Sequence, residues 1–333
     1  MAENQTAQRT EFSQMGHREA AKRLFEGTGY VNSSKVKVKE GIICSKMMMQ
    51  GVDFDLVYNP LKHLGYKAVL NVVGEIYAAF YRPDALSVSL GISSHFCYED
   101  IAELWSGVVA ACKEHSVATL HLDLFPSLNG LQISLSLTGC RPADVESKIK
   151  SPASMDLICL SGNVGAAYMG QHVLEREKSV FLAAGEANAK QPDLSKYKYL
   201  LSQYLCPEIA ADTVENFTKG GFYPTAGVFD SRGLSEAVNS LCEQTGLGAK
   251  IYLDRLPIAS ETFEMANEIH IDAVTAATSG GEDYRLIYTL PIDQFESFHK
   301  EMQNFDVIGH LCQQDVGAVM VTPDGAELPI KEM

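Results

Sequence analysis

Two glycine-bearing turns carry the residues most suited to chemistry in this sequence. Gly280-Gly281-Glu282-Asp283-Tyr284 places two carboxylates directly after two glycines. Glycines let the backbone approach a ligand closely, and neighbouring acids can then point into a cleft. A plain turn with solvated acids has the same pattern, so both interpretations stand at this point.

The second turn, Gly162-Asn163-Val164-Gly165, follows a predicted strand over 156–161 and precedes a helix predicted to run through Leu174. Backbone N–H groups at the start of a helix can bind a phosphate. Turns of this kind are also common where no ligand binds. The turn is therefore a candidate phosphate site with a purely structural alternative.

Hydrophobic periodicity predicts the elements that position these turns. Leu86, Val88, Leu90 and Ile92 alternate with small polar residues, which indicates a half-buried strand. Apolar residues recur every fourth position over 62–80, which predicts a helix that Arg82-Pro83 would stop. On the same grounds we expect further helices over 16–25, 98–115, 196–205, 207–219, 233–245 and 260–269, and strands over 36–49, 119–125, 131–138, 250–253, 284–289 and 318–322.

The order of these elements predicts an α+β chain of two domains. We expect an N-terminal arm and helix over 1–26, an α+β domain over 27–140, a linker over 141–152, and an α/β domain over 153–333. A length of 333 residues suits two separate cores.

Composition excludes several classes of function. The formal charge of −15 argues against nucleic acid, which needs a basic face, and against an anionic membrane surface. No apolar run is long enough to span a membrane, and the first residues lack the pattern of a secretory signal, so we expect a cytoplasmic protein. The 8 cysteines contain no Cys-x-x-Cys pair, and the 9 histidines no i, i+4 pair, so no zinc site is predicted.

Several collinear motifs together resemble the thiamine-monophosphate kinases of the aminoimidazole-ribonucleotide-synthetase superfamily. The resemblance runs from about residue 10 to the C-terminus. It rests on Gly51-Val52-Asp53-Phe54-Asp55, the run 62–68, Ser161-Gly162 with Gly165-Ala166-Ala167, Pro224-Thr225-Ala226, Ser231 with Gly233-Leu234, and 280–284. It implies that 27–140 is a dimerisation and nucleotide domain that forms a dimeric β-barrel. It also implies a C-terminal α/β domain, and a cleft in which ATP phosphorylates thiamine phosphate.

The sequence departs from that family where the family holds Mg²⁺ with aspartates. Magnesium requires hard oxygen ligands to neutralise phosphate charge. Here the segment 33–39 contains no acid, Lys46 and Gln50 replace acids before the Gly51 turn, and Glu75 replaces a helix aspartate. Asp123 survives without its two glycines, which are His121 and Leu122; Phe229 and Arg232 replace two further acids, and Asp230 is one residue out of register.

These departures predict a relative with impaired catalysis. Two unit charges about 4 Å apart interact by roughly 4 kcal/mol at an effective dielectric near 20, so a cation in place of a carboxylate repels the metal strongly. Our hypothesis is that Lys46 and Arg232 stand in for the lost metals and pair with Glu75, Asp123 or Asp230. No catalytic residue is assigned.

A dimeric ligand-binding or scaffolding protein is the function that the sequence favours. Its expected partners are a second copy, a nucleotide or thiamine-like ligand, and an unidentified protein. The candidate ligand-binding residues are Asp53, Lys67, Gly162, Gly165, Gly281, Glu282, Asp283 and Tyr284, with the alternative that Asp53, Asp55 and Lys67 are turn and helix-surface residues.

The competing interpretation is an active kinase that uses ATP and Mg²⁺. It would need rearranged metal ligands, drawn from Asp123, Glu75, Asp230, Glu282 and Asp283. Other superfamily branches fit less well. Selenophosphate synthetases would need a reactive N-terminal cysteine or selenocysteine, and the hydrogenase maturation factor a C-terminal cysteine, whereas this sequence ends Lys331-Glu332-Met333.

Overall fold

The structure is a computed structural model that describes residues 10–11, 15, 17–30, 41–184 and 193–330. The chain divides into two compact units, one made of residues 1–72 and 83–139 and the other of 73–82 and 140–333. Helix α3 (Leu61–Ala78) contributes its first part to unit 1 and its last part to unit 2. Each unit is described by itself.

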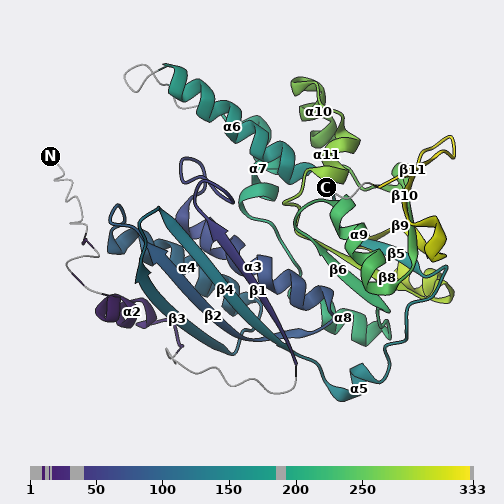
Figure 1. The fold of residues 1–333 in the computed structure, drawn as a ribbon, viewed down its shortest axis with the longest axis horizontal. Coiled ribbons are helices and arrows are strands. Elements are labelled where there is room, and N and C mark those ends of the chain that lie inside the picture. The colour runs from purple at the N-terminus through teal and green to yellow at the C-terminus, as the bar shows by residue number, and fades with distance from the viewer. Residues whose placement is uncertain (1–9, 12–14, 16, 31–40, 185–192, 331–333) are drawn as a thin grey trace. The chain divides into compact units, whose positions relative to one another are not determined.

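Unit 1 is built on a small mixed sheet of four strands in the order β1-β4-β2-β3 (Figure 1). Strands β1 and β4 pair antiparallel, whereas β2 and β3 pair parallel. The strands are β1 (Ile42–Met49), β2 (Arg82–Ile92), β3 (Thr119–Pro126) and β4 (Leu131–Cys140), and the helices besides α3 are α2 (His17–Phe25) and α4 (Tyr98–Glu114).

The two faces of this sheet differ sharply in character. Alternate residues of each strand point to one face, as Leu86, Leu120 and Leu137 do, and these are buried. The other face carries small polar side chains, among them Ser45, whose hydroxyl lies 2.8 Å from that of its cross-strand partner Ser136. Sheet alternation in the sequence therefore predicted the strands and their buried face correctly.

Helices α3 and α4 cross at two glycines. A Cβ at Gly65 would lie 2.0 Å from the carbonyl oxygen of Leu104, and one at Gly107 would lie 1.9 Å from that of Lys62. Neither distance is possible for a real side chain, so the two helices approach this closely only because both positions are glycine. The crossing fixes α4 against α3 within unit 1.

We predict that Gly107→Ala destabilises unit 1 by about 2 kcal/mol, because the added methyl group must push the two helices apart. Denaturation followed by fluorescence measures this directly, since the single tryptophan, Trp105, is buried on the same helix. Ser106→Ala, on the exposed side of α4, is the control and should stay within about 0.5 kcal/mol of the parent. An unchanged denaturation midpoint for Gly107→Ala would contradict the close approach of α3 and α4 at this glycine.

Unit 2 is a mixed sheet of seven strands, in the order β11-β10-β7-β9-β5-β8-β6, with helices packed on it. Its strands are β5 (Leu157–Ser161), β6 (Ala226–Asp230), β7 (Gly248–Tyr252), β8 (Arg285–Leu290), β9 (Phe305–Cys312), β10 (Ala318–Val321) and β11 (Glu327–Pro329). Its helices are α5 (Ala143–Glu146), α6 (Ala166–Ala184), α7 (Lys198–Leu205), α8 (Thr213–Gly220), α9 (Leu234–Thr245), α10 (Ser260–Ile269), α11 (Ala273–Ser279) and α12 (Phe295–Glu301).

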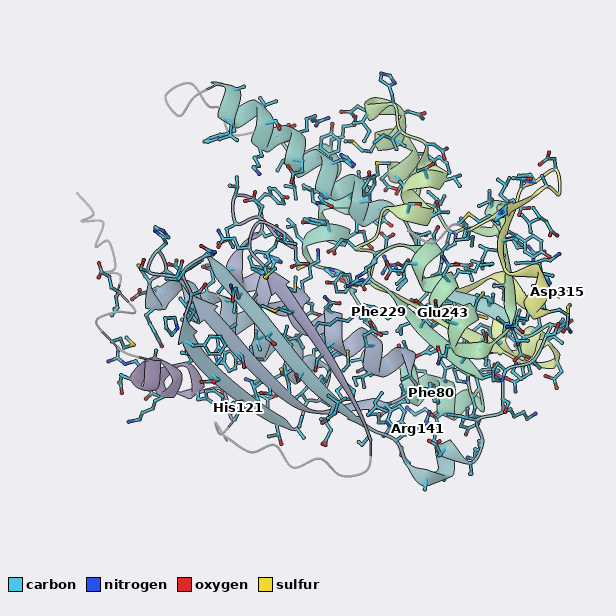
Figure 2. The ribbon with its side chains drawn as sticks, in the orientation of Figure 1. Phe80, His121, Arg141, Phe229, Glu243 and Asp315 are labelled. Atoms are coloured by element: carbon cyan, nitrogen blue, oxygen red, sulfur yellow. The ribbon has the colours of Figure 1, made fainter. Side chains whose placement is uncertain are left out.

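An aromatic cluster anchors the end of α3 in unit 2. Phe80, just beyond the helix, has its ring centroid 6.1 Å from those of both Phe217 and Tyr288 (Figure 2). The hydroxyl of Tyr288 donates to the carbonyl of Tyr77. Burying these rings together stabilises the packing of α3 on β8 beyond simple area burial.

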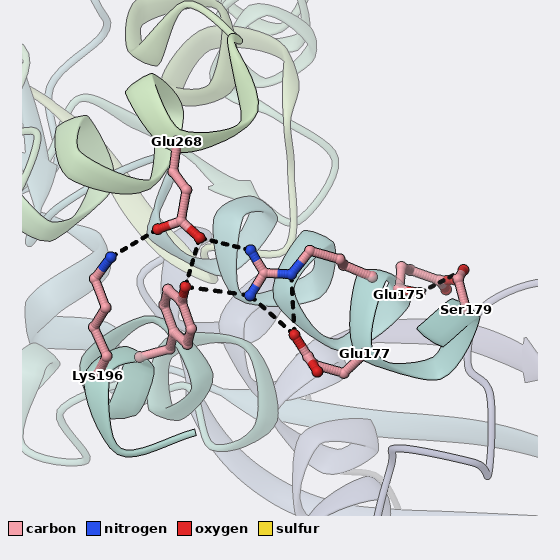
Figure 3. Close-up of polar contacts among 7 residues, drawn as sticks. Glu175, Glu177, Ser179, Lys196 and Glu268 are labelled. Carbon is pink, nitrogen blue, oxygen red and sulfur yellow. Dashed lines mark hydrogen bonds and ion pairs between the residues drawn. The ribbon is translucent and has the colours of Figure 1, made fainter. Parts of the chain in front are cut away.

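A polar network ties α6 to α10 on the surface of the same unit (Figure 3). The carboxylate of Glu268 receives hydrogen bonds from Arg176 at 2.7 Å, Lys196 at 2.7 Å and the Tyr197 hydroxyl at 2.6 Å. These donors lower the pKa of Glu268 to about 2. The network holds α6 and the segment before α7 against α10. It lies away from the strand ends that form the candidate site described below.

Several sequence-based boundaries were wrong. Helix α3 ends at Ala78, and Arg82-Pro83 open strand β2 instead of stopping the helix. Residues 207–212 precede α8 in an irregular segment, whereas the sequence predicted helix over 207–219. The sequence missed β6, β9, β11, α11 and α12, and the predicted linker 141–152 contains the short helix α5. Residues 36–40 of the strand predicted over 36–49 lie outside the described residues.

No helix in the described part of the chain is long and apolar enough to cross a membrane.

Candidate functional site

Three chain turns meet at one end of the unit 2 sheet. Strand β8 lies between β5 and β6 and runs antiparallel to both. The start of β8 therefore lies beside the ends of β5 and β6, as the pairing of Arg285 with Asp230 indicates. The sequence-predicted turns 162–165 and 280–284 are brought together there, along with the turn 230–233.

Asp283 caps the N-terminus of α6. Its two carboxylate oxygens accept the N–H groups of Gly165 at 2.6 Å and of Ala167 at 3.0 Å, and the side chain is buried. A carboxylate is favourable here because the helix start carries unpaired N–H groups and a partial positive charge. Asp283 therefore occupies two of the backbone N–H groups that the sequence predicted to be available to a phosphate.

Asp230 is a fully buried carboxyl beside Asp283. Its Oδ1 accepts the N–H of Gly233 at 2.9 Å, while its Oδ2 has no hydrogen-bond partner. Burial, and next the negative charge of Asp283, raise the pKa of Asp230 to about 8. Burial also raises the pKa of Asp283 to about 6, opposed by the N–H groups of Gly165 and Ala167 and by Arg285. At neutral pH the pair therefore holds one proton, on Asp230.

Arg285 supplies the positive charge of this cluster, and sequence reasoning missed it. The side chain is 8% exposed; its Nε donates to the carbonyl of Asn163 at 2.7 Å, and its guanidinium also donates to Gln203. It therefore holds the 162–165 turn. Gly162 has a φ of +65°, and a Cβ there would meet the guanidinium at 3.4 Å. An arginine inside the apolar run 284–290 was the signal that could have found it.

The 280–284 turn is held in left-handed backbone conformations. Gly281, Glu282 and Tyr284 have φ values of +73°, +65° and +56°. Such values are costly for Glu282 and Tyr284 and persist only where neighbours enforce them. The Glu282 N–H donates to the carbonyl of Ser231 at 3.0 Å, and a Cβ at Gly281 would lie 3.0 Å from the backbone of Arg232. This turn is thus locked against the 230–233 turn.

Phe229 is a packing residue. It lies in strand β6 and is labelled in Figure 2, and its ring centroid lies 5.4 Å from that of Tyr284, edge to face. The ring also fills the space over α3 at Gly74, where a Cβ would lie 2.2 Å from Cε2 of Phe229. An aromatic ring therefore occupies the position for which the family resemblance predicts an acid. Glu75, the next residue of α3, is half-buried.

The expected pairing of Arg232 with Asp230 is wrong. Arg232 is an exposed side chain, and its guanidinium lies 3.4 Å from Glu236, one turn further along in α9. Asp230 instead turns into the protein and binds the Gly233 N–H. The reason is burial: Asp230 is inaccessible, whereas Arg232 follows it on the solvent side of the turn.

A pair between Lys46 and Asp123 is also wrong, for reasons of sheet geometry. Lys46 lies opposite Leu135 on the helix-covered face, whereas Asp123 lies beside Ser89 on the polar face. Their strands, β1 and β3, are the two edges of the sheet. Side chains on opposite faces and opposite edges of one sheet do not meet.

Asp53, Asp55 and Lys67, the remaining candidates in unit 1, lie in two turns and in the buried part of a helix. Asp53 closes the turn after β1, because its Oδ2 accepts the Met49 N–H at 2.7 Å, and Asp55 likewise accepts the Val57 N–H at 2.8 Å. Both fit the turn interpretation. Lys67 is 3% exposed, so its interpretation as a helix-surface residue was wrong.

The described residues contain no group of three or more His, Cys, Asp or Glu side chains arranged to hold a metal ion. The acid-free segment 33–39 lies outside them.

The chain is similar to known proteins in part of its sequence and in its fold. Residues 33–140 match the family model of the N-terminal domain of AIR synthase related proteins. Beyond this segment the chain is similar, at low identity, to thiamine-monophosphate kinases and to the hydrogenase maturation protein HypE.

Two relatives illustrate the sequence similarity. A Methanocaldococcus jannaschii protein with the provisional name hydrogenase expression/formation protein is 24% identical over 82% of this chain and 77% of that protein. The thiamine-monophosphate kinase of Aquifex aeolicus is 23% identical over 78% of this chain and 79% of that enzyme.

Two solved structures illustrate the similarity of fold. The Aquifex aeolicus kinase in complex with AMPPCP and TMP superimposes with a TM-score of 0.68 at 21% identity, covering 86% of this chain and 84% of that one. HypE in complex with ATP superimposes with a TM-score of 0.65 at 16% identity, covering 96% of both chains.

The buried acid pair predicts that stability falls as pH rises. The folded pKa of Asp230 lies above its unfolded value near 3.9, so the folded state binds the extra proton and loses stability as that proton leaves. Between pH 6.5 and 8.5 the loss from Asp230 should be about 2 kcal/mol. Urea denaturation followed by circular dichroism at both pH values measures it.

Asp230→Asn is the matched variant, because it keeps the shape and the acceptor for Gly233 without a titrating group. Its free energy of unfolding should change less between the two pH values than that of the parent, by about the same 2 kcal/mol. Equal pH dependence in the two proteins would show that Asp230 is ionised throughout.

Proposed function

We propose that this protein is a dimeric, ligand-binding relative of thiamine-monophosphate kinase that does not carry out magnesium-dependent phosphoryl transfer. The observation that carries the proposal is the packing of Phe229, a buried ring between Gly74 and Tyr284 at a position where the family resemblance implies a metal-binding acid. An aromatic ring offers no oxygen to a magnesium ion, which needs hard oxygen ligands.

The neighbouring acids support the same conclusion. Asp283 is engaged by two helix N–H groups, and Asp230 is fully buried with a pKa raised to about 8. A metal ligand must give lone pairs to the ion, and each oxygen of Asp283 already accepts one N–H group at the start of α6. Arg232 on the same turn places a positive charge next to the site, which disfavours a dication.

A nucleotide is the first ligand to test. The related kinase was solved in complex with AMPPCP and TMP, and HypE in complex with ATP. We infer that a nucleotide binds this protein without a metal. This would separate binding, which needs shape and hydrogen bonds, from transfer, which needs the metal.

Calorimetric titration of the full chain with AMPPCP, in Mg²⁺ and in EDTA, tests this function. We expect affinities within about twofold of each other and no ATP consumption with thiamine phosphate and Mg²⁺. The Aquifex aeolicus kinase is the control that should turn over. Turnover comparable with that control would overturn the proposal, and absence of AMPPCP binding in both buffers would leave a scaffolding function only.

The second copy is proposed to bind on the polar face of the unit 1 sheet. The edge strand β1 turns Ile43 and Met47 to that face, and they are 64% and 54% exposed. Exposed apolar side chains on an open sheet face are typical of a covered interface. The family resemblance implies a dimeric barrel made from this sheet.

Analytical ultracentrifugation tests the dimer. We expect the parent to sediment as a dimer, and Met47→Glu to weaken association at least tenfold because a carboxylate would be buried in the interface. Val180→Glu, an equally exposed apolar position on α6 in unit 2, is the control and should remain dimeric. A monomeric parent at micromolar concentration would contradict the prediction.

A further inference from the structure

Unit 1 contains a cavity of about 500 Å³ that lies apart from the unit 2 strand-end cluster described above. It is formed by the segment after β1, the start of α3, the loop after β2 and the first turns of α4. Its volume is in the range of small-molecule sites. Its lining residues include two carboxylates, Asp100 and Glu103, and no lysine or arginine.

One wall of the cavity is built rigidly. The side-chain oxygen of Gln50 accepts the Leu131 N–H at 2.9 Å, and the Gln50 N–H donates to the carbonyl of Leu131 at 3.0 Å. Gly130, with a φ of +59°, leaves room for Gln50, because a Cβ there would lie 2.5 Å from the Gln50 Oε1. The wall is therefore formed before any ligand arrives.

A buried hydroxyl without a partner belongs to Ser93, whose N–H donates to the carbonyl of Gly130 at 3.2 Å. Ser93 is 3% exposed and lines the cavity, and its Oγ has no hydrogen-bond partner. Leaving a buried hydroxyl unpaired costs free energy, and such groups in native structures call for an explanation. A ligand with an N–H donor would satisfy this oxygen.

The charge of the cavity is negative once the helix termini are included. Asp100 accepts the Cys97 N–H at 2.8 Å, so its charge is partly offset by the start of α4. The start of α3 at Leu61 contributes a further partial positive charge of about half a unit. No helix N-terminus offsets the charge of Glu103 in this way. The two acids contribute a charge of about −2 and the two helix N-termini about +1, so the net charge of the cavity is negative.

The apolar part of the lining suits a ring. Leu56, Leu61 and Phe96 line the cavity beside the acids. An aromatic side chain attracts a cation through its face, and apolar walls favour a flat hydrophobic body. Together with the unpartnered hydroxyl, these walls define the chemistry of the occupant.

We propose that this cavity binds a small organic cation, in which a primary amine meets Glu103 and Ser93 while an apolar, ring-bearing body lies against Leu61 and Phe96. This site lies wholly in unit 1 and does not depend on the proposed nucleotide binding. Its failure and the failure of that function are therefore separate results.

Three probes of one shape test the proposal on the full chain. Phenethylamine is a cation, 2-phenylethanol is neutral and 3-phenylpropionate is an anion. Ligand-observed NMR titration at low salt should give an affinity for the amine at least tenfold above that for the alcohol, equivalent to about 1.4 kcal/mol, and no binding of the anion. Added salt should weaken the binding of phenethylamine and leave that of 2-phenylethanol unchanged. Equal binding of amine and alcohol, or preferred binding of the anion, would overturn the proposal.

Two variants place the amine in the cavity. Glu103→Gln should weaken the binding of phenethylamine at least fivefold, and Ser93→Ala at least threefold. Both variants should fold, because Glu103 is exposed and the Ser93 hydroxyl makes no hydrogen bond. Glu114→Gln makes the same change at the far end of α4, about 16 Å away, and should bind as the parent does. Weakening by Glu114→Gln equal to that by Glu103→Gln would mean non-specific attraction to an acidic protein.

Discussion

The burial of two carboxylates beside one guanidinium is the constraint on which unit 2 depends. Asp283 neutralises the start of α6, and Arg285 holds the turn that leads into that helix. Removing either partner would leave a buried charge or unpaired N–H groups, which costs several kcal/mol. Asp230 escapes the same cost because its raised pKa keeps it neutral at pH 7. The three turns are thus held together by the charges of Asp283 and Arg285 and by the neutral carboxyl of Asp230.

This balance explains why the strand ends of unit 2 form a closed cluster. Helix N-termini and glycine turns are well suited to phosphate, but here an internal carboxylate occupies the N–H groups. Phe229 fills the space over Gly74, and the left-handed turn at 281–284 is locked to the 230–233 turn. These contacts occupy groups that an anion or metal would otherwise meet, and Asp230 Oδ2 is left without a hydrogen-bond partner.

The sequence predicted the unit 1 sheet well and the unit 2 sheet incompletely. Strict alternation, as in β2 and β4, gives a clear signal because one face of that sheet is polar. Strand β8 is buried on both faces, and β6 and β9 are short or mixed, so their periodicity is weak. The turns of Asp283 and Gly162 lie together in the fold, but no pattern in the sequence distinguishes a capping carboxylate from a ligand-binding one. That distinction depends on which N–H groups the carboxylate reaches after folding.

The two units differ in where a buried polar atom lacks a hydrogen-bond partner. In unit 2 the polar atom without a partner at the site is Asp230 Oδ2, which protonation makes tolerable and which burial seals. In unit 1 the buried Ser93 hydroxyl belongs to a residue that lines a cavity, which the exposed carboxylate of Glu103 also lines. A hydroxyl cannot relieve its desolvation by changing its charge near neutral pH, whereas a carboxyl can. The physical chemistry of the orphaned groups thus favours unit 1 as the place where this chain keeps an accessible small-molecule site.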